Sequence, residues 1–163
     1  PQPVIAQVDG LATAAGCQLV STCDMAVASE EALFGVNGVN IGLFCSTPMV
    51  ALTRNIPKKH AFEMLTTGEF ISALRAKELG LINRISKEDK LSDETFKLAK
   101  TVSQKLSAAV KIGKKAFYKQ MEMPLAEAYQ YTGEVMAENM GLLDTQEGIN
   151  AFLEKRPPEW FNK

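Results

Sequence analysis

Charged side chains are spread very unevenly along the 163 residues, and this distribution limits the folds that the chain can adopt. Residues 1–54 hold only five of them, and 22 uncharged residues separate Glu31 from Arg54. A run of that length is long enough to raise the question of a membrane span. It contains several glycines and asparagines and Pro48, however, which do not suit a lipid-facing helix. We therefore interpret it as buried structure of a folded domain and expect no membrane span.

The first part of the chain shows short apolar runs typical of buried strands, separated by small residues. Residues 4–8, 25–28 and 33–35 are predicted strands, and the small residues at 14–20 predict a buried helix. Alternation of strands and helices is typical of α/β proteins. The predicted fold class is therefore α/β, and the length suits one domain.

Helices are predicted to dominate from residue 46 onward. Ser72 is a suitable N-cap and Gly80 a suitable stop for a helix over residues 73–79, and residues 81–85 follow as a strand. Two apolar stripes at helical spacing indicate core or subunit contacts. They comprise Leu91, Phe96, Ala99, Val102 and Leu106, and then Leu125, Tyr129, Thr132, Met136, Met140 and Leu143.

Charge and histidine content exclude several classes of function. The formal net charge of -1 gives no strong attraction to nucleic acid or to an anionic membrane. Seven lysines lie between Glu94 and Glu122, and an acidic region follows. We interpret both as solvated helical faces, so nucleic-acid binding is not expected. The single histidine, His60, excludes a metal site built on several histidines, and no metal is expected.

The three cysteines, Cys17, Cys23 and Cys45, show no Cys-x-x-Cys spacing. An odd number without such spacing predicts free thiols in a reducing compartment. Cys45 could act as a nucleophile only with His60 as its base. We favour the alternative of a structural thiol, because free cysteine usually behaves as a small hydrophobic residue.

Motifs along the whole chain occur in a characteristic order. They are Pro-Val-Ile-Ala-Gln-Val-Asp-Gly (3–10), Ala-Gly-Cys-Gln-Leu (15–19), Cys-Asp (23–24), Ala-Leu-Phe-Gly (32–35), Ala-Phe-Glu-Met-Leu-Thr-Thr-Gly (61–68), Ile-Ser-Ala (71–73), Gly-Leu-Ile-Asn-Arg (80–84), Gln-Glu-Gly-Ile (146–149) and Ala-Phe-Leu-Glu-Lys-Arg (151–156). Together they resemble the crotonase family, the enoyl-CoA hydratase/isomerase superfamily. Residues 40–48, Asn-Ile-Gly-Leu-Phe-Cys-Ser-Thr-Pro, further resemble one subgroup of it.

The resemblance implies a ββα spiral core, present in part, over residues 1–85 and a helical region for trimer contacts over residues 86–163. It implies an acyl-CoA thioester as substrate, no cofactor, and a homotrimer or dimer of trimers. It also implies that the family's domain begins upstream of the position matched by Pro1, where it carries one of two oxyanion-hole amides. We expect an intracellular protein, in the mitochondrial matrix of a eukaryote or the cytoplasm of a bacterium.

The second oxyanion-hole amide is implied to lie within this chain. The family's Gly-Gly-Gly run corresponds to Ala14-Ala15-Gly16, so the backbone N–H of Ala15 is the candidate donor, with Gly16 beside it in the binding site. A helix N-terminus suits a thioester enolate, because its free N–H groups and its dipole favour negative charge. From the residues alone, a helix start built of small residues for close packing is the alternative.

Both positions at which the family carries a catalytic glutamate are substituted, by Gln18 and by Gly38. A side-chain amide cannot exchange a proton at neutral pH, and glycine has no side chain. The resemblance therefore predicts that hydration is weak or absent. Residues 43–48 also depart from the family's glycine-rich loop and make it shorter and bulkier.

Phe152 and Lys155 match substrate-binding positions near the C-terminus. The resemblance implies that Lys155 reaches a CoA phosphate, often across a subunit boundary, while a solvated lysine near a helix end is the alternative. The expected function is acyl-CoA binding in fatty-acid metabolism. Two alternatives stay open: an enzyme that uses only the oxyanion hole, of the decarboxylase or thioesterase type, and a non-catalytic subunit.

Overall fold

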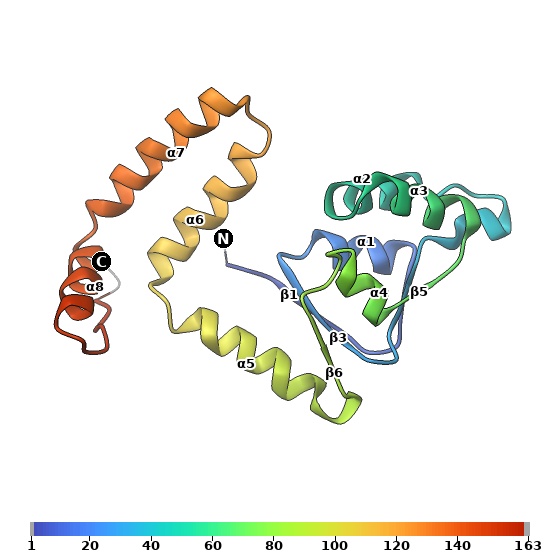
Figure 1. Cartoon of the computed structure of the whole chain (residues 1–163), viewed down its shortest axis with the longest axis horizontal. Coiled ribbons are helices and arrows are strands. Elements are labelled where there is room, and N and C mark those ends of the chain that lie inside the picture. The colour runs from blue at the N-terminus through green and yellow to red at the C-terminus, as the bar shows by residue number, and fades with distance from the viewer. Residues whose placement is uncertain (1, 162–163) are drawn as a thin grey trace. The chain divides into compact units, whose positions relative to one another are not determined.

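The computed structural model describes residues 2–161, in which strands and helices alternate as far as Ser86 and only helices follow (Figure 1). The α/β class predicted from the sequence is confirmed. The alternating part comprises β1 (Ile5–Val8), β2 (Leu11–Thr13), α1 (Ala15–Thr22), β3 (Met25–Ser29), β4 (Leu33–Gly35), the 3-10 helix η1 (Asn37–Ile41), α2 (Ser46–Asn55), α3 (Lys58–Thr67), β5 (Ile71–Ser72), α4 (Ala73–Glu78) and β6 (Arg84–Ser86). The helical part comprises the 3-10 helix η2 (Glu88–Lys90), α5 (Leu91–Ser103), α6 (Ser107–Gln120), α7 (Leu125–Met140) and α8 (Leu143–Leu153).

The chain forms two compact units. One is Val4–Ala99, and the other takes the chain from Lys100 onward together with its first residues. Most of α5 therefore belongs to the first unit. The division into regions 1–85 and 86–163 stays a prediction. Within residues 2–161, no helix combines the length and the apolar character that a membrane crossing requires.

Two three-stranded sheets form the frame of the first unit. Strands β1, β3 and β6 are parallel in that order, while β4 lies between the parallel β2 and the antiparallel β5. In the second sheet Thr13 pairs with Gly35, so β2 and β4 end side by side. The segments that follow these two strands therefore leave from the same edge of the sheet.

The main core of the first unit packs these strands against α1, α2, α3 and α4. Phe34, Leu52 and Leu65 are almost completely buried, and Cys17 joins them from α1. Burial of each large apolar side chain contributes about 1.5–3 kcal/mol to stability. The core thus holds α1, which begins the candidate site, firmly against the sheet that precedes it.

The sequence predicts buried structure for the uncharged segment between Glu31 and Arg54, and the structure confirms this for only part of it. Ala32 and residues 34–36 are buried, whereas Leu33 and residues 40–44 are exposed. The exposed residues form the end of η1 and the loop after it. A loop carries backbone N–H and C=O groups that no sheet or long helix satisfies, and this favours the surface over the core.

Two strand predictions differ from the structure. The sequence does not reveal β2, because three residues are too few to show alternation. The strand predicted at residues 81–85 is β6 instead, because Leu81 belongs to the end of α4: its N–H donates to Ala76 O (2.9 Å), and Gly80 has φ 85°. This Schellman motif confirms Gly80 as the helix stop, and Ser72 caps the start of α4 as predicted.

The predicted apolar stripes are exposed along much of their length. On α5 the buried residues are Leu91 and Leu98, which pack on Val27 of β3, whereas Phe96 is 73% exposed. Of the two contacts predicted for this stripe, core or subunit, Phe96 therefore does not make the core contact, and Leu106 lies beyond the end of α5. The exposed apolar residues of α7 and the first turn of α8 are Leu125, Tyr129, Met136, Met140 and Leu143.

Candidate functional site

The candidate oxyanion donor is the first residue of α1, Ala15, and only Ala14 separates it from the end of β2. Ala14 N–H donates to Gly35 O (2.9 Å), and Ala14 O accepts a hydrogen bond from Gln18 N–H (3.0 Å). Because hydrogen bonding inside the helix begins at Gln18, the amides of Ala15 and Gly16 have no acceptor within α1. Both residues are exposed, so this end of the helix is accessible.

The turn that leads into α1 is strained at Ala14. This residue has φ 47° and ψ -112°, a combination that glycine adopts far more readily than alanine. A residue held in such a sparsely populated region costs about 1–3 kcal/mol. Strained residues of this kind cluster at functional sites, where the surrounding structure holds them in place. Here the turn places the Ala15 amide at the edge where β2 and β4 end.

A hydrogen bond that the sequence does not reveal joins these two strand ends. Thr13 Oγ1 donates to Asn37 Oδ1 (2.6 Å), which links the last residue of β2 to the first residue of η1. It holds η1, with Gly38, beside the turn into α1. Knowledge of β2 and of its pairing with β4 would have been needed to find this contact.

Gly38 lies against the loop that follows η1. Leu43 N–H donates to Gly38 O (2.9 Å), so the loop folds back onto η1. A Cβ atom at position 38 would lie 2.5 Å from Leu43 O and 2.9 Å from Cys45 Sγ. Both distances are too short for a real contact, and one of the opposing atoms belongs to the backbone. The loop therefore occupies the space that a side chain at position 38 would need.

Gln18, the other substituted acid position, lies on the second turn of α1. It is half-buried, and its side-chain amide has no hydrogen-bond partner among residues 2–161. The amide can donate or accept a hydrogen bond but cannot act as a general acid or base. Neither Gln18 nor Gly38 thus supplies a proton-transfer group.

The cysteines near the site do not have the properties of a nucleophile. Burial raises the pKa of the Cys17 thiol to about 11, so it stays protonated at neutral pH. Cys45 is half-buried and packs on the core beside Gly38. The imidazole of His60 lies 3.3 Å from Arg75 Nη2 and 3.6 Å from Glu63.

Within residues 2–161, no group of three or more His, Cys, Asp or Glu side chains could hold a metal ion.

The candidate phosphate ligand Lys155 lies in a left-handed turn directly after α8. Its φ is 56°, its N–H donates to Phe152 O (3.3 Å), and Arg156 N–H donates to Ala151 O (3.0 Å). These bonds form a Schellman motif, in which the left-handed position is usually glycine. Lys155 is exposed and forms no ion pair with any of residues 2–161. Phe152 is also exposed.

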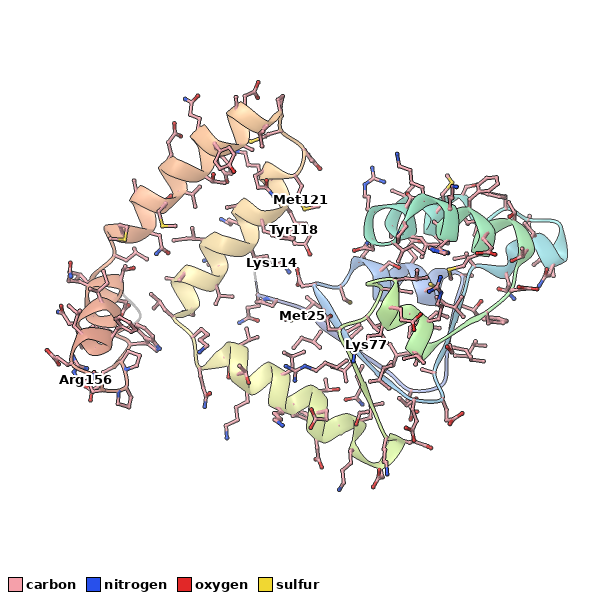
Figure 2. The ribbon with its side chains drawn as sticks, viewed as in Figure 1. Met25, Lys77, Lys114, Tyr118, Met121 and Arg156 are labelled. Carbon is pink, nitrogen blue, oxygen red and sulfur yellow. The ribbon has the colours of Figure 1, made fainter. Side chains whose placement is uncertain are left out.

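Arg156, the neighbouring cation, lies just after α8 (Figure 2). Carboxylates of its own chain form ion pairs with it. Its Nη1 and Nη2 donate to the two oxygens of Glu147 (2.7 and 2.9 Å), and its Nε donates to Glu154 Oε2 (2.5 Å). Glu147 Oε1 also accepts from Glu159 N–H (2.9 Å). The Arg156 guanidinium and this amide lower the pKa of Glu147 to about 2. Of the adjacent pair, Lys155 is therefore the cation that stays available to a ligand.

We expect the segment after α8 to detach as the pH falls from 4.5, the ordinary pKa of a glutamate, to about 2, the pKa of Glu147 in the folded chain. A carboxyl whose pKa is lowered by folding stabilises the fold above the unfolded pKa and loses this contribution on acidification. The only tryptophan, Trp160, reports the change, because its Nε1–H donates to Gln104 O (3.1 Å). Its emission should shift to longer wavelength over this range. In Glu147→Gln, emission at pH 7 should already be shifted, and an unchanged acid transition would contradict the prediction.

Comparison with known proteins finds similarity over the whole chain. A family model described as "Enoyl-CoA hydratase/isomerase" matches residues 1–163. Relatives from Xenopus laevis and Homo sapiens, both named "Enoyl-CoA hydratase domain-containing protein 3, mitochondrial", are each 52% identical over 160 residues. These residues are 98% of this chain and 54% and 53% of the two relatives. The chain thus spans about half the length of the curated relatives that it matches.

Two solved structures are similar in both sequence and fold. The enoyl-CoA hydratase of Mycobacterium smegmatis is 55% identical, and human enoyl-CoA hydratase domain-containing protein 3 is 52% identical. Each superimposes with a TM-score of 0.95 and covers 97% of this chain and 62% of the other. The crotonase-type fold implied by the sequence motifs is confirmed, and so is the subgroup that residues 40–48 resemble.

Proposed function

This chain belongs to the enoyl-CoA hydratase/isomerase family, and from that premise we propose that it binds acyl-CoA thioesters in fatty-acid metabolism. We propose further that its hydration activity is weak or lost and that it needs no cofactor beyond the thioester. One observation supports this proposal most strongly: the candidate site has a backbone donor for an oxyanion but no space for one of the two carboxylates. The helix start at Ala15 has the geometry of an oxyanion donor, whereas position 38 has no room for a carboxylate.

The chemistry follows from these two features. An N–H at a helix start can hold the oxygen of a thioester enolate, and one such donor is typically worth about 3 kcal/mol of transition-state stabilisation. Hydration also requires groups that activate water and move protons. Neither Gln18 nor Gly38 can do so, and the pKa of Cys17 is raised by burial. The site therefore favours stabilising an oxyanion over adding water to a double bond.

Two alternatives each rest on an observation. An enzyme that needs only oxyanion stabilisation, of the decarboxylase or thioesterase type, is favoured by the accessible start of α1. A non-catalytic subunit that assembles with active relatives is favoured by the exposed apolar residues of α7 and α8. Turnover of acyl-CoA thioesters by the purified protein separates them: the first alternative requires product, and the second requires CoA binding without product.

Binding of CoA tests the proposed function through Lys155. We expect the purified protein to bind CoA more tightly than 3′-dephospho-CoA, and Lys155→Ala to lose that preference. A charge-assisted contact to phosphate is worth about 1.5–3 kcal/mol when it is well ordered, and exposure and salt reduce it. Titration calorimetry at low ionic strength with both ligands measures the difference. If the wild type and Lys155→Ala preferred CoA over 3′-dephospho-CoA to the same extent, Lys155 would be a solvated lysine without a phosphate contact.

We propose that the protein assembles as a homotrimer or a dimer of trimers. The proposal is supported by large apolar side chains on α7 that stay exposed in the single chain, with Tyr129 at 74% and Met136 at 63%. Exposed apolar patches of this kind usually mark an interface. Light scattering at micromolar concentration is expected to give three or six times the mass of one chain. Met136→Asp should shift the protein toward the monomer, and a wild-type monomer would contradict the proposal.

For the location we propose the mitochondrial matrix if the chain is eukaryotic and the cytoplasm if it is bacterial. The names of the Xenopus laevis and Homo sapiens relatives include the word mitochondrial, and a similar structure comes from a mycobacterium. Immunolocalisation in the source cell distinguishes the matrix from other compartments.

A further inference from the structure

The left-handed turn at Lys155 is held by the segment that follows it. Beyond the turn, the chain folds back along its own unit: Trp160 Nε1–H donates to Gln104 O, and Phe161 N–H donates to Asp144 Oδ1 (2.5 Å). Asp144 is fully buried. These contacts restrain the far end of the segment, while Arg156 restrains the end next to Lys155.

Glu147 connects both parts of this segment to α8. One of its oxygens accepts from Arg156 Nη1 and also from the backbone N–H of Glu159, and the other accepts from Arg156 Nη2. Arg156 precedes the two prolines of the segment and Glu159 follows them, so one carboxylate fixes the chain on both sides of this stiff element. With an exposed fraction of 12%, the Glu147 side chain is also the least exposed member of the ion pairs at this end of α8.

Lys155 needs such a restraint because its backbone conformation is unfavourable for a residue with a side chain. Its φ of 56° is left-handed, a conformation that is unfavourable for an L-residue other than glycine. Without the pair between Glu147 and Arg156, the turn can relax to conformations in which the lysine side chain points elsewhere. The direction of the one cation that stays available therefore depends on a carboxylate eight positions earlier in the chain.

We infer that Glu147 is a positioning residue for phosphate recognition: its bidentate pair with Arg156 and its bond to the Glu159 amide hold Lys155 in the left-handed turn that presents its ammonium group to the phosphate of CoA. This inference rests on the proposed function, in which Lys155 contacts that phosphate. It assigns to Glu147 no contact with the ligand.

Positioning and simple electrostatics predict opposite effects when Glu147 is removed. A carboxylate near an anion-binding site repels the anion, so its loss should strengthen CoA binding on Coulomb grounds. Positioning predicts weaker binding, because Lys155 loses its fixed direction. Glu134 on α7 is a matched control, since it is an exposed glutamate that forms no ion pair among residues 2–161.

The experiment measures the affinity of the purified wild type, Glu147→Ala and Glu134→Ala for CoA and for 3′-dephospho-CoA. We expect the wild type and Glu134→Ala to prefer CoA by about tenfold, the effect of a charge-assisted contact of about 1.4 kcal/mol. Glu147→Ala should lose most of that preference while its affinity for 3′-dephospho-CoA stays within about twofold. If Glu147 had only a structural role, the variant would bind both ligands more weakly by the same factor, and the ratio of the two affinities would stay unchanged.

Each other outcome has a defined meaning. Failure of the wild type to bind CoA overturns the proposed function, and binding without preference overturns the phosphate contact of Lys155. A wild-type preference that Glu147→Ala retains, or a stronger preference in that variant, overturns the positioning role alone. If Glu147→Ala does not fold, Arg156→Lys decides, because it keeps the charge and removes the bidentate geometry; an unchanged preference in that variant would also overturn the inference.

Discussion

Replacing Gly38 with glutamate is expected to destabilise the protein without raising its rate of crotonyl-CoA hydration. A Cβ at this position would lie 2.5 Å from the backbone oxygen of Leu43, so the loop must move before any side chain fits. Overpacking of this kind typically costs about 1–3 kcal/mol. Urea denaturation measures the loss, and absorbance of the enoyl thioester measures hydration. Addition of Gln18→Glu should not rescue the rate while the loop occupies the space.

A matched control is available on α6. Gly113 has open space around its Cβ position and lies within a helix, so Gly113→Glu should stabilise the protein by about 0.5–1 kcal/mol. Loss of one general acid or base costs about 10²–10⁴ in rate, and in the wild type neither Gln18 nor Gly38 can supply one. If Gly38→Glu with Gln18→Glu reached a turnover near the enzyme median of about 10 s⁻¹, the loop would be shown to yield and the acids alone to limit the reaction.

Replacing Ala15 with proline is expected to abolish polarisation of a bound thioester carbonyl. Proline removes the backbone N–H, and its fixed φ suits the first position of a helix. It also favours a ψ of about 120–160° in the residue before it, whereas Ala14 has ψ -112°, so the variant is informative only where α1 is shown to be retained. A conjugated enoyl-CoA absorbs at longer wavelength when hydrogen bonds polarise its carbonyl, so the red shift on binding should disappear. Any turnover of a thioester should fall by about 10²–10³, the usual cost of one oxyanion donor.

The control for this change is Lys58→Pro, at the first residue of α3. Pro57 before it has φ -58° and ψ 137°, which a following proline favours, so the fold should be retained. Circular dichroism checks that α1 forms in Ala15→Pro. A red shift that persists in the folded variant would show that Ala15 does not donate to the carbonyl and would favour the alternative of a helix start chosen for packing.

Local features of the sequence were enough to predict much of the first unit. The apolar runs indicated β1, β3 and β4, and the cap at Ser72 and stop at Gly80 correctly bounded α4. These signals depend on neighbouring residues alone, because capping and helix termination are interactions within a few positions of the chain. The position of the helix start at Ala15 follows from the same kind of signal.

Other features depend on partners that are distant in sequence. Strand β2 is too short to show a pattern and exists because it pairs with β4, and the bond between Thr13 and Asn37 follows only from that pairing. Phe96 has the spacing of a core residue, but the direction in which α5 packs on β3 leaves it exposed. Periodicity predicts that a helix has an apolar face; the tertiary contact selects which face is buried.

The sequence by itself determined that Gln18 and Gly38 stand where the family resemblance implies glutamates, and that Ala15 opens a helix of small residues. Only the tertiary structure decided that Gly38 has no space for a side chain, because that depends on how the loop from Leu43 folds back. The tertiary structure also decided that Arg156 pairs with Glu147, whereas Lys155 stays available to a ligand. Residue identity sets the chemistry that a position can perform, whereas backbone conformation and packing between distant segments set which groups have room and freedom to perform it.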